Sequence, residues 1–321
     1  MSIEREVTDL PKSTAANNRM KENRTIKDWV LATRPWSFPA SSMSVVTSAA
    51  MMVWVAVSQG LHFDWINAVL SLIAMVFFQT GGNLASDYHD YVSGVDKPGE
   101  ESVQILTSGR FTKREVAIFS ACAFAAACAI GLVICFRSSI SILVIGAVGL
   151  LLAVFYYFLK YHALGDLCIF LEYAILPMIG TSIVTIGRIW WPVLLLAAVV
   201  GPVTVAILHA NNARDIPSDR ASGIKTFAMV IGLKASRWYY HGCVLCPYVL
   251  IILGIIAGFF PWTALLSFLA LPRAIGIVKD VNKLMSSELP FSMIDVRTAS
   301  LQLLFSLLLA GGFALGAIFG F

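Results

Sequence analysis

The residues in this sequence best suited to chemistry are aspartates, and they are gathered in two clusters. The first cluster contains Asn83, Asp87 and Asp90, spaced four and three residues apart, and Asp96 follows them. On a helix this spacing places the first three side chains on one face. Carboxylates that share a helix face repel each other, so such a face is typical of a site where a cation bridges them.

The second cluster has the same character. Asp215 and Asp219 are four residues apart, and Asn212 precedes Asp215 by about one helical turn. One acidic helix end is commonly a solvated loop, but two such ends, each led by asparagine, favour a shared site. Oxygen ligands alone suit Mg²⁺. We predict one catalytic Mg²⁺ site, whose ligands are Asp87, Asp90, Asp96, Asp215 and Asp219.

Basic residues complete the predicted site. Mg²⁺ held by a few carboxylates usually shares its other positions with water and substrate phosphates. Nearby cations can then bind the phosphate oxygens, and the segments around the two clusters supply several of them. These cations are Lys97, Arg110, Lys113, Lys160, Arg214 and Lys225. The predicted ligand is a diphosphate, and an apolar bundle below it has room for a long hydrocarbon tail.

The elements that must position these residues are membrane spans. Of the 321 residues, 58% are hydrophobic and 13% are charged, which is about half the charged fraction of a typical soluble domain. This composition excludes a soluble globular enzyme and a disordered chain. The net charge of +4 is too small, on so apolar a chain, to indicate a nucleic-acid partner.

Nine apolar stretches are long enough to cross a bilayer, so we predict an all-α membrane bundle of nine transmembrane helices. Continuous apolar blocks without alternation of period two disfavour a β-barrel. The eighth stretch contains Pro272 and Arg273 and is the least regular. The predicted spans cover residues 38–58, 65–86, 116–136, 138–159, 167–187, 189–213, 238–258, 262–281 and 299–321.

The basic residues predict how the bundle is oriented. All but two of the 23 lysines and arginines lie in the amino-terminal tail or in loops on one side, and the exceptions are Arg137 and Arg188. The positive-inside rule therefore places the amino terminus and both aspartate clusters at the cytoplasm, and the carboxyl terminus on the opposite side. Residues 1–27 are predicted to form a polar cytoplasmic tail, and residues 28–321 the transmembrane domain.

At these motifs the sequence resembles the UbiA-type intramembrane prenyltransferases, and among them the 1,4-dihydroxy-2-naphthoate polyprenyltransferases of menaquinone biosynthesis. The resemblance extends from Arg34 to the end of the chain. A shorter match, YYFLKYHALGDL, begins at Tyr156. The four longer stretches that carry it are RPWSFPAS from Arg34, NLASDYHDYVSGVDKP from Asn83, NNARDIPSDRASGIKT from Asn211 and TASLQLLFSLLLAGG from Thr298.

The resemblance implies nine helices around a central cavity, Mg²⁺ as the cofactor and a polyprenyl diphosphate as the substrate. It assigns both aspartate pairs to the metal motifs and Asp96 to the trailing position, and it places Tyr156 and Lys160 at the diphosphate. Ser86 stands where the family commonly has asparagine, so either Asn83 or the Ser86 hydroxyl takes that role. Arg34 is either an anion contact or an arginine that extends to the membrane surface.

The implied reaction transfers the polyprenyl group to 1,4-dihydroxy-2-naphthoate, with release of diphosphate and CO₂, in the cell membrane. Another aromatic acceptor, such as 4-hydroxybenzoate or homogentisate, fits the metal motifs equally well. A cation-coupled transporter is an alternative of a different class, although its carboxylates would be expected at the membrane midplane. Glu172, in the fifth span, is either a functional carboxylate near the acceptor ring or a neutral, hydrogen-bonded acid.

Overall fold

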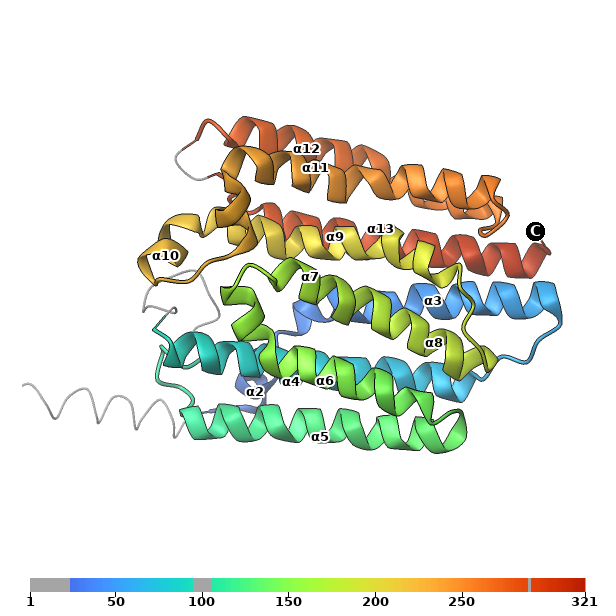
Figure 1. The fold of residues 1–321 in the computed structure, drawn as a ribbon, viewed down its shortest axis with the longest axis horizontal. Coiled ribbons are helices and arrows are strands. Elements are labelled where there is room, and N and C mark those ends of the chain that lie inside the picture. The colour runs from blue at the N-terminus through green and yellow to red at the C-terminus, as the bar shows by residue number, and fades with distance from the viewer. Residues whose placement is uncertain (1–23, 95–104, 288–289, 321) are drawn as a thin grey trace, which may run out of the picture.

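The chain folds into a bundle of helices that run side by side, as the computed structural model shows for residues 24–94, 105–287 and 290–320 (Figure 1). The helices in chain order are α2 (Ile26–Ala32), η1 (Pro35–Ser37), α3 (Phe38–Gln59), α4 (Trp65–Val92), α5 (Lys113–Arg137), α6 (Ser141–Tyr161), α7 (Gly165–Phe170), η2 (Leu171–Ile175), α8 (Leu176–Ile186), α9 (Val193–Arg214), α10 (Ile216–Ala221), α11 (Phe227–Ile256), η3 (Trp262–Ala270), α12 (Leu271–Leu284) and α13 (Ile294–Phe319).

The predicted membrane fold is confirmed, with one difference in its eighth span. Within the described residues, eight helical segments are long and apolar enough to cross a bilayer. Most of their bounds lie within a few residues of the predicted spans, but α4 ends at Val92 where residue 86 was predicted, and α11 begins at Phe227 where residue 238 was predicted. The eighth predicted span is not one α-helix. It consists of the 3₁₀ segment η3 followed by α12. Pro272 lies in the first turn of α12, where proline fits because it has no N–H to give in a helix interior.

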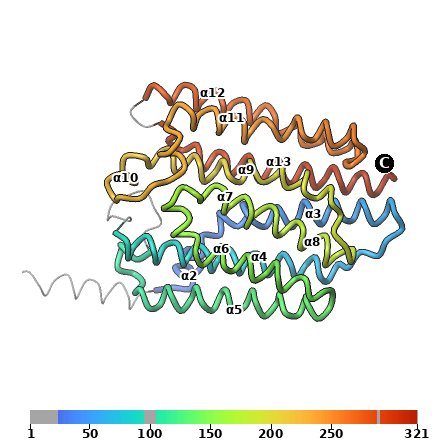
Figure 2. Tube along the Cα trace, in the orientation of Figure 1, coloured from blue at the N-terminus to red at the C-terminus, as the bar shows by residue number. Residues whose placement is uncertain are grey.

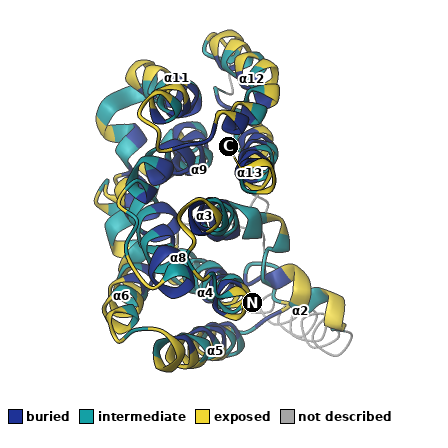
Figure 3. Ribbon diagram, turned by 90° about the vertical axis from the view of Figure 1, so that its right-hand side faces the viewer, coloured by how far each residue is buried: buried dark blue, intermediate teal, exposed yellow. Residues whose placement is uncertain are grey.

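The outer surface of the bundle is apolar, as expected for a multi-pass membrane protein. In Figure 3 the outward faces of α5, α6 and α12 are exposed, whereas α9 and much of α3 and α13 are buried. The exposed side chains on α5 and α6 include large apolar ones, and Phe136 is 90% exposed. So large an exposed apolar surface would not be stable in water, and it is accommodated by lipid.

Polar contacts join the first, sixth and last spans at the core. The Gln302 amide of α13 donates to the Pro39 carbonyl of α3 at 3.2 Å, and it lies 3.5 Å from the Thr204 hydroxyl of α9. The Thr298 hydroxyl bonds the Tyr240 hydroxyl of α11 at 2.5 Å. The stretch from Thr298 that supports the family resemblance therefore serves helix packing.

The first span contains many buried hydroxyl groups, and several of them bond within their own helix. Ser42 donates to the Phe38 carbonyl at 2.7 Å, and Thr47 donates to the Met43 carbonyl at 2.7 Å. Bonds of this kind satisfy a hydroxyl in an apolar medium without a partner from another helix.

The closest approach between two of the late elements occurs at Gly312. The Thr263 hydroxyl of η3 donates to the Gly312 carbonyl of α13 at 2.6 Å. A Cβ atom on Gly312 would lie 2.5 Å from the Thr263 carbonyl oxygen. Only glycine lets these two backbones pack at this distance.

One end of the bundle carries both aspartate clusters, and we call it the acidic end. It comprises α2, the last turns of α4, the start of α7, and α10, and it lies opposite the end of α13 (Figure 2). The predicted tail, residues 1–27, falls outside the described residues except for its last four. Helix α2 already begins at Ile26.

Candidate active site

The first aspartate cluster lies on the last two turns of α4, as its spacing predicted. Helix α4 begins at Trp65, where the Asp64 side chain accepts a bond from the Asn67 N–H at 2.9 Å. It continues to Val92, beyond the predicted end of its span at residue 86. Asp87, on these turns, is only 2% exposed.

Arg34 pairs with Asp87 through a salt bridge between the guanidinium and the carboxylate. Arg34 has a left-handed backbone with φ of 55°, directly before the 3₁₀ turn η1, and a non-glycine residue adopts this conformation when its surroundings fix it. Asn83 supplies that fixation, because its amide donates to the Thr33 carbonyl at 3.0 Å and to the Ser37 hydroxyl at 2.9 Å. The Arg34 guanidinium is therefore held in position beside Asp87, and Asn83 stabilises the turn that carries Arg34.

Asp90 is surrounded by donors from the end of α6 and from its own helix. The Lys160 ammonium lies 3.3 Å from one carboxylate oxygen, and the Tyr161 hydroxyl donates to the other. The Ser86 hydroxyl lies 3.4 Å from the oxygen that Lys160 contacts. The serine that departs from the family pattern thus contacts Asp90 in this protein.

Asp215 marks the end of α9 and is held by the residue before it. Arg214 donates to both Asp215 oxygens, at 2.8 and 2.9 Å, in a bidentate pair. The same guanidinium bonds Asp295, at the start of α13, at 2.9 Å. Two carboxylates from different helices thus fix the direction of Arg214.

Asp219, on the short helix α10, is the most buried carboxylate of the second cluster. It is 7% exposed, and its Oδ2 atom has no hydrogen-bond partner among the described residues. The pKa of Asp219 is raised to about 6, chiefly by burial; Lys160 and Arg214 act to lower the pKa, and the carboxylates of Asp215 and Asp90 act to raise it. Asp90 acts on Asp219 although they belong to different clusters, so the fold brings the two clusters together.

The donors at the acidic end fit a hard divalent cation. Each of Asp87, Asp90 and Asp215 is paired with a basic side chain, and across the described ranges no three acidic, histidine or cysteine side chains meet as a ready metal cage. The buried Oδ2 of Asp219 and its repulsion by two other carboxylates nevertheless mark a place that lacks positive charge. The oxygen-only donor set suits Mg²⁺.

The other predicted site residues are distributed unevenly. Arg110 is paired with Asp28 of α2, and it forms no salt bridge with those predicted metal ligands that the structure describes. Lys225 is exposed, and its backbone N–H bonds the Tyr161 carbonyl at 3.2 Å, which brings it beside the Asp90 group. Asn212 is buried in α9. Asp96 and Lys97 lie outside the described residues.

Several contacting residues were not predicted from the sequence as site residues. The Tyr161 hydroxyl donates to Asp90, and Asp295 accepts a hydrogen bond from Arg214. For Tyr161, its position next to Lys160 in the sequence was a signal; no signal in the sequence pointed to Asp295. A buried pair of His209 and Asp166, 2.7 Å apart, links α9 to α7. Such partners come from distant parts of the chain, so spacing along one helix does not indicate them.

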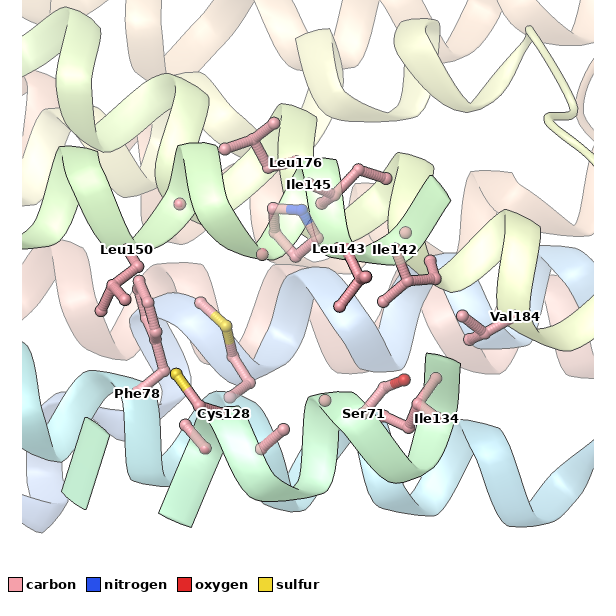
Figure 4. A pocket seen from close by; sticks show the side chains of 18 of the residues that line it. Ser71, Phe78, Cys128, Ile134, Ile142, Leu143, Ile145, Leu150, Leu176 and Val184 are labelled. Atoms are coloured by element: carbon pink, nitrogen blue, oxygen red, sulfur yellow. The ribbon is translucent and has the colours of Figure 1, made fainter. Parts of the chain in front are cut away.

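An apolar cavity of about 390 Å³ lies between α4, α5, α6 and α8 (Figure 4). Phe78, Leu150 and Leu176 are among the apolar residues that line it, and Glu172 contributes a carboxyl group. Tyr156, the residue predicted at the diphosphate, packs against the cluster that includes the cavity residue Met75. The cavity therefore adjoins the residues that lead to the acidic end.

Comparison with known proteins identifies relatives along most of the chain. The sequence model of the UbiA prenyltransferase family matches residues 44–294. UbiA prenyltransferase domain-containing protein 1 of Xenopus tropicalis is 30% identical over 293 residues, which cover 89% of this chain and 81% of that protein. The Mus musculus protein of the same name is 30% identical, with 89% and 84% covered.

Solved structures share the fold. A UbiA homologue from Aeropyrum pernix K1 in its apo form has a TM-score of 0.66 at 18% identity, with 84% of this chain and 96% of that chain covered. A UbiA homologue from Archaeoglobus fulgidus bound to GPP and Mg²⁺ has a TM-score of 0.65 at 15% identity, with 89% and 98% covered. At these identities the likeness establishes the fold.

Proposed function

We propose, since this chain belongs to the UbiA prenyltransferase family, that it transfers a polyprenyl group from a polyprenyl diphosphate to 1,4-dihydroxy-2-naphthoate. Family membership decides between prenyl transfer and cation-coupled transport in favour of transfer. The names of the relatives specify no acceptor, so the acceptor is proposed from the motifs in this sequence. Two features that resemble the menaquinone branch support it: the GVDKP extension at residues 94–98 and the NNARD form of the second motif.

The observation that carries the proposal is the meeting of the two aspartate clusters above an apolar cavity. Asp219 is buried, and the carboxylates of both Asp215 and Asp90 raise its pKa, while Lys160 pairs with Asp90 and Arg214 pairs with Asp215. A polar, highly charged end above an apolar interior suits a molecule with a diphosphate head and a hydrocarbon tail. The Archaeoglobus fulgidus homologue bound to GPP and Mg²⁺ supports the same ligand class.

Each part of the site has a separate role in the proposed reaction. Asp87, Asp90, Asp215 and Asp219 would hold Mg²⁺, which when bound supplies positive charge to the diphosphate. Arg34, Lys160 and Arg214 add charge to the leaving group as the prenyl C–O bond breaks and its electron pair leaves with the diphosphate. The apolar interior keeps water away from the allylic cation.

The acceptor ring then forms the new carbon–carbon bond. A ring carbon that carries the carboxylate attacks the allylic carbon, and the carboxylate leaves as CO₂. The electron pair of the broken C–C bond restores the aromatic ring, so the product is a prenylated naphthoquinol. No external base is needed, since CO₂ leaves in place of a ring proton.

The proposed location is the cell membrane, with the acidic end at the cytoplasm. The support is the distribution of the basic residues, because only Arg137 and Arg188 lie toward the other side. Both substrates would then be bound from the bilayer or the cytoplasm.

A two-acceptor assay tests the proposal. Purified protein, Mg²⁺ and one polyprenyl diphosphate are mixed in detergent with either 1,4-dihydroxy-2-naphthoate or 4-hydroxybenzoate, and the product masses are measured. We expect a prenylated naphthoquinol that has lost CO₂, with the first acceptor alone. Product with only the second acceptor would overturn the naphthoate assignment, and absence of both product and pyrophosphate would overturn prenyl transfer to these acceptors.

A matched pair of variants tests the site itself. Asp90→Asn and Asp215→Asn keep the size of each side chain but remove its charge, and we expect both to abolish turnover while the protein stays folded. Asp64→Asn, at the opposite end of the bundle, is the control and should keep its activity. Near-normal activity of either variant at saturating Mg²⁺ would contradict the assignment of that aspartate.

A further inference from the structure

Glu172 carries a buried carboxyl group that has no strong hydrogen-bond partner among the residues that the structure describes. It is 4% exposed and lines the apolar cavity between α4, α5, α6 and α8. Within the described ranges, its carboxyl has one hydrogen-bond contact, with the Cys168 thiol 3.8 Å from Oε2, and a thiol is a weak donor. A polar group in such surroundings is costly and therefore points to a function.

The helix that carries Glu172 is shaped around it. Residues Leu171–Ile175 form a π-turn between α7 and α8, and π-turns within helices frequently occur at functional sites. Pro177 has no N–H to give to the Tyr173 carbonyl one turn earlier. The Ser44 hydroxyl of α3 donates to that carbonyl instead. A neighbouring helix thus stabilises the wider turn on which Glu172 is placed.

The π-turn lies just deeper in the bundle than the aspartates. A Cβ atom on Gly82 of α4 would be 3.8 Å from the Tyr173 hydroxyl oxygen. Gly82 precedes Asp87 by five residues, or about 7.5 Å along a helix. Glu172, next to Tyr173, is therefore near the depth where the reacting carbon of a diphosphate bound at the acidic end would lie.

The cavity around Glu172 suits a flat apolar molecule that carries a hydroxyl group. A prenyl tail has no polar atom for a carboxyl, and the apolar residues Met75, Phe78 and Leu176 would hold a tail without it. A cavity of about 390 Å³ lies within the size range of small-molecule sites, which combine apolar walls with a few polar groups that fix orientation. An aromatic ring with a phenolic hydroxyl has both properties.

We propose that Glu172 accepts a hydrogen bond from a ring hydroxyl of the aromatic acceptor, whose ring lies against Met75, Phe78 and Leu176. This inference rests on the proposed function and assigns the acceptor side of the same site. It makes Glu172 a specificity residue, since an acceptor without that hydroxyl leaves the buried carboxyl unpaired.

Variants at Glu172 test the proposal through the separation of two Michaelis constants. Glu172→Leu removes the hydrogen-bond acceptor, so the KM for 1,4-dihydroxy-2-naphthoate should rise about tenfold, the equivalent of one hydrogen bond. The KM for the prenyl diphosphate should stay within about twofold, because the aspartates bind that substrate. Glu172→Gln keeps a carbonyl oxygen and should restore part of the affinity for the acceptor.

Naphthoates that carry one hydroxyl provide a readout that a merely structural role would not change. Each is used as a competitive inhibitor against the acceptor. The two inhibitors are 2-naphthoates that keep either the 1-hydroxyl or the 4-hydroxyl. For wild-type protein, one of them should bind about tenfold more weakly than the dihydroxy compound, because it lacks the hydroxyl that donates a hydrogen bond to Glu172. In Glu172→Leu that difference should disappear, as expected for two groups that contact each other. Thr185→Val, on the same helix but outside the cavity lining, is the control for general disturbance.

The outcomes distinguish this inference from the proposed function. If prenyl transfer proceeds and both Michaelis constants of Glu172→Leu rise together, or neither rises, the inference is wrong and the proposed function stands. If wild-type protein transfers to no aromatic acceptor, the proposed function fails. In that case, calorimetry measures binding of 1,4-dihydroxy-2-naphthoate in the absence of prenyl diphosphate. Binding to Glu172→Leu that is tenfold weaker than to wild-type protein supports the inference, and equal binding to both proteins, or no binding to either, overturns it.

Discussion

Asp219 is the residue at which the requirements of folding and of the proposed chemistry conflict most clearly. Its ionised carboxylate is buried, and burial raises its pKa to about 6. Above that pH the folded protein must hold an unfavourable charge, which a bound cation would relieve. A residue whose buried charge lowers the stability of the folded protein in this way is typical of a functional site.

The first prediction concerns Asp219→Asn. Prenyl transfer should fall by roughly two orders of magnitude or more, as when a charged group that stabilises a transition state is lost. Thermal stability in EDTA should rise at pH 7.5, because asparagine carries no buried charge. The gain should shrink as pH falls through about 6, where wild-type Asp219 takes up a proton and loses the same penalty.

Unfolding scans of both proteins at pH 7.5 and pH 5, with activity measured in parallel, check this prediction. A variant that is both inactive and much less stable at pH 7.5 would show that Asp219 serves the fold. A stability gain that is larger at pH 5 would contradict the direction of the pKa shift.

The second prediction concerns Asn83, which acts through the turn of Arg34. Asn83→Ala removes the two bonds that fix this turn, so the KM for the prenyl diphosphate should rise about tenfold with a smaller change in kcat. Asn67→Ala is a matched control, since the Asn67 amide bonds the Val184 carbonyl at 3.0 Å at the other end of α4. It should lower stability by a similar amount without changing that KM, whereas an equal KM change in both variants would contradict the role of Asn83.

The sequence predicted the residues of the acidic end better than their partners. Helical spacing predicted that Asp87 and Asp90 lie on one helix, because the period of a helix fixes which residues share a face, and both are in α4. It did not predict that Arg34 pairs with Asp87 or that Asp295 holds Arg214. Those pairs depend on how separate helices rotate and pack, which one sequence does not reveal.

Among the helices, the bounds of the spans were predictable and their internal breaks were not. An apolar run has to end where charged residues begin, so α3 and α4 start where expected. The π-turn before Pro177 and the 3₁₀ segment η3 were not predicted. A proline marks a weak point in a helix, but a distant side chain, such as Ser44 for the π-turn, decides what forms there.

The contact of α13 with η3 leads to a third prediction. Gly312→Ala places a Cβ atom 2.5 Å from the Thr263 carbonyl oxygen and 2.9 Å from the Ala264 Cα atom. Both are backbone atoms, which cannot relieve the clash by a change of rotamer. We expect a loss of about 1–3 kcal/mol in stability, as for other overpacked cores. Gly276→Ala in α12 has open space at its Cβ position, so it should be neutral or stabilising by up to about 1 kcal/mol.

Unfolding midpoints of the purified proteins in one detergent measure both substitutions. If Gly312→Ala were as stable as Gly276→Ala, the two elements could not pack as closely as the structure shows. A defect in activity larger than the defect in stability would show that this contact also affects the site.

At the scale of the whole molecule, the distribution of charge leads to a fourth prediction, which concerns orientation. Lys113 and Ser138 flank α5 at its two ends, and both are exposed. Single cysteines at these positions, in a background without the six native cysteines, are treated in intact cells with a membrane-impermeant maleimide. Ser138→Cys should react and Lys113→Cys should react only after lysis, because we propose that the acidic end faces the cytoplasm.

Reaction of both positions in lysed cells is the control that each cysteine is accessible. The opposite pattern in intact cells would reverse the proposed orientation and place the acidic end outside. Equal labelling of both positions in sealed cells would indicate that the chain inserts in two orientations.

The contact between Pro39 and Gln302 has a consequence for how the protein is made. The two residues are 263 positions apart, so at about 5–20 residues per second a ribosome needs roughly 13 to 50 s to synthesise the interval. During that time the first helix is in the bilayer without its last neighbour. The hydroxyls of Ser42 and Thr47 donate to carbonyls of their own helix. Such bonds satisfy these polar groups in lipid before the last helix has been synthesised.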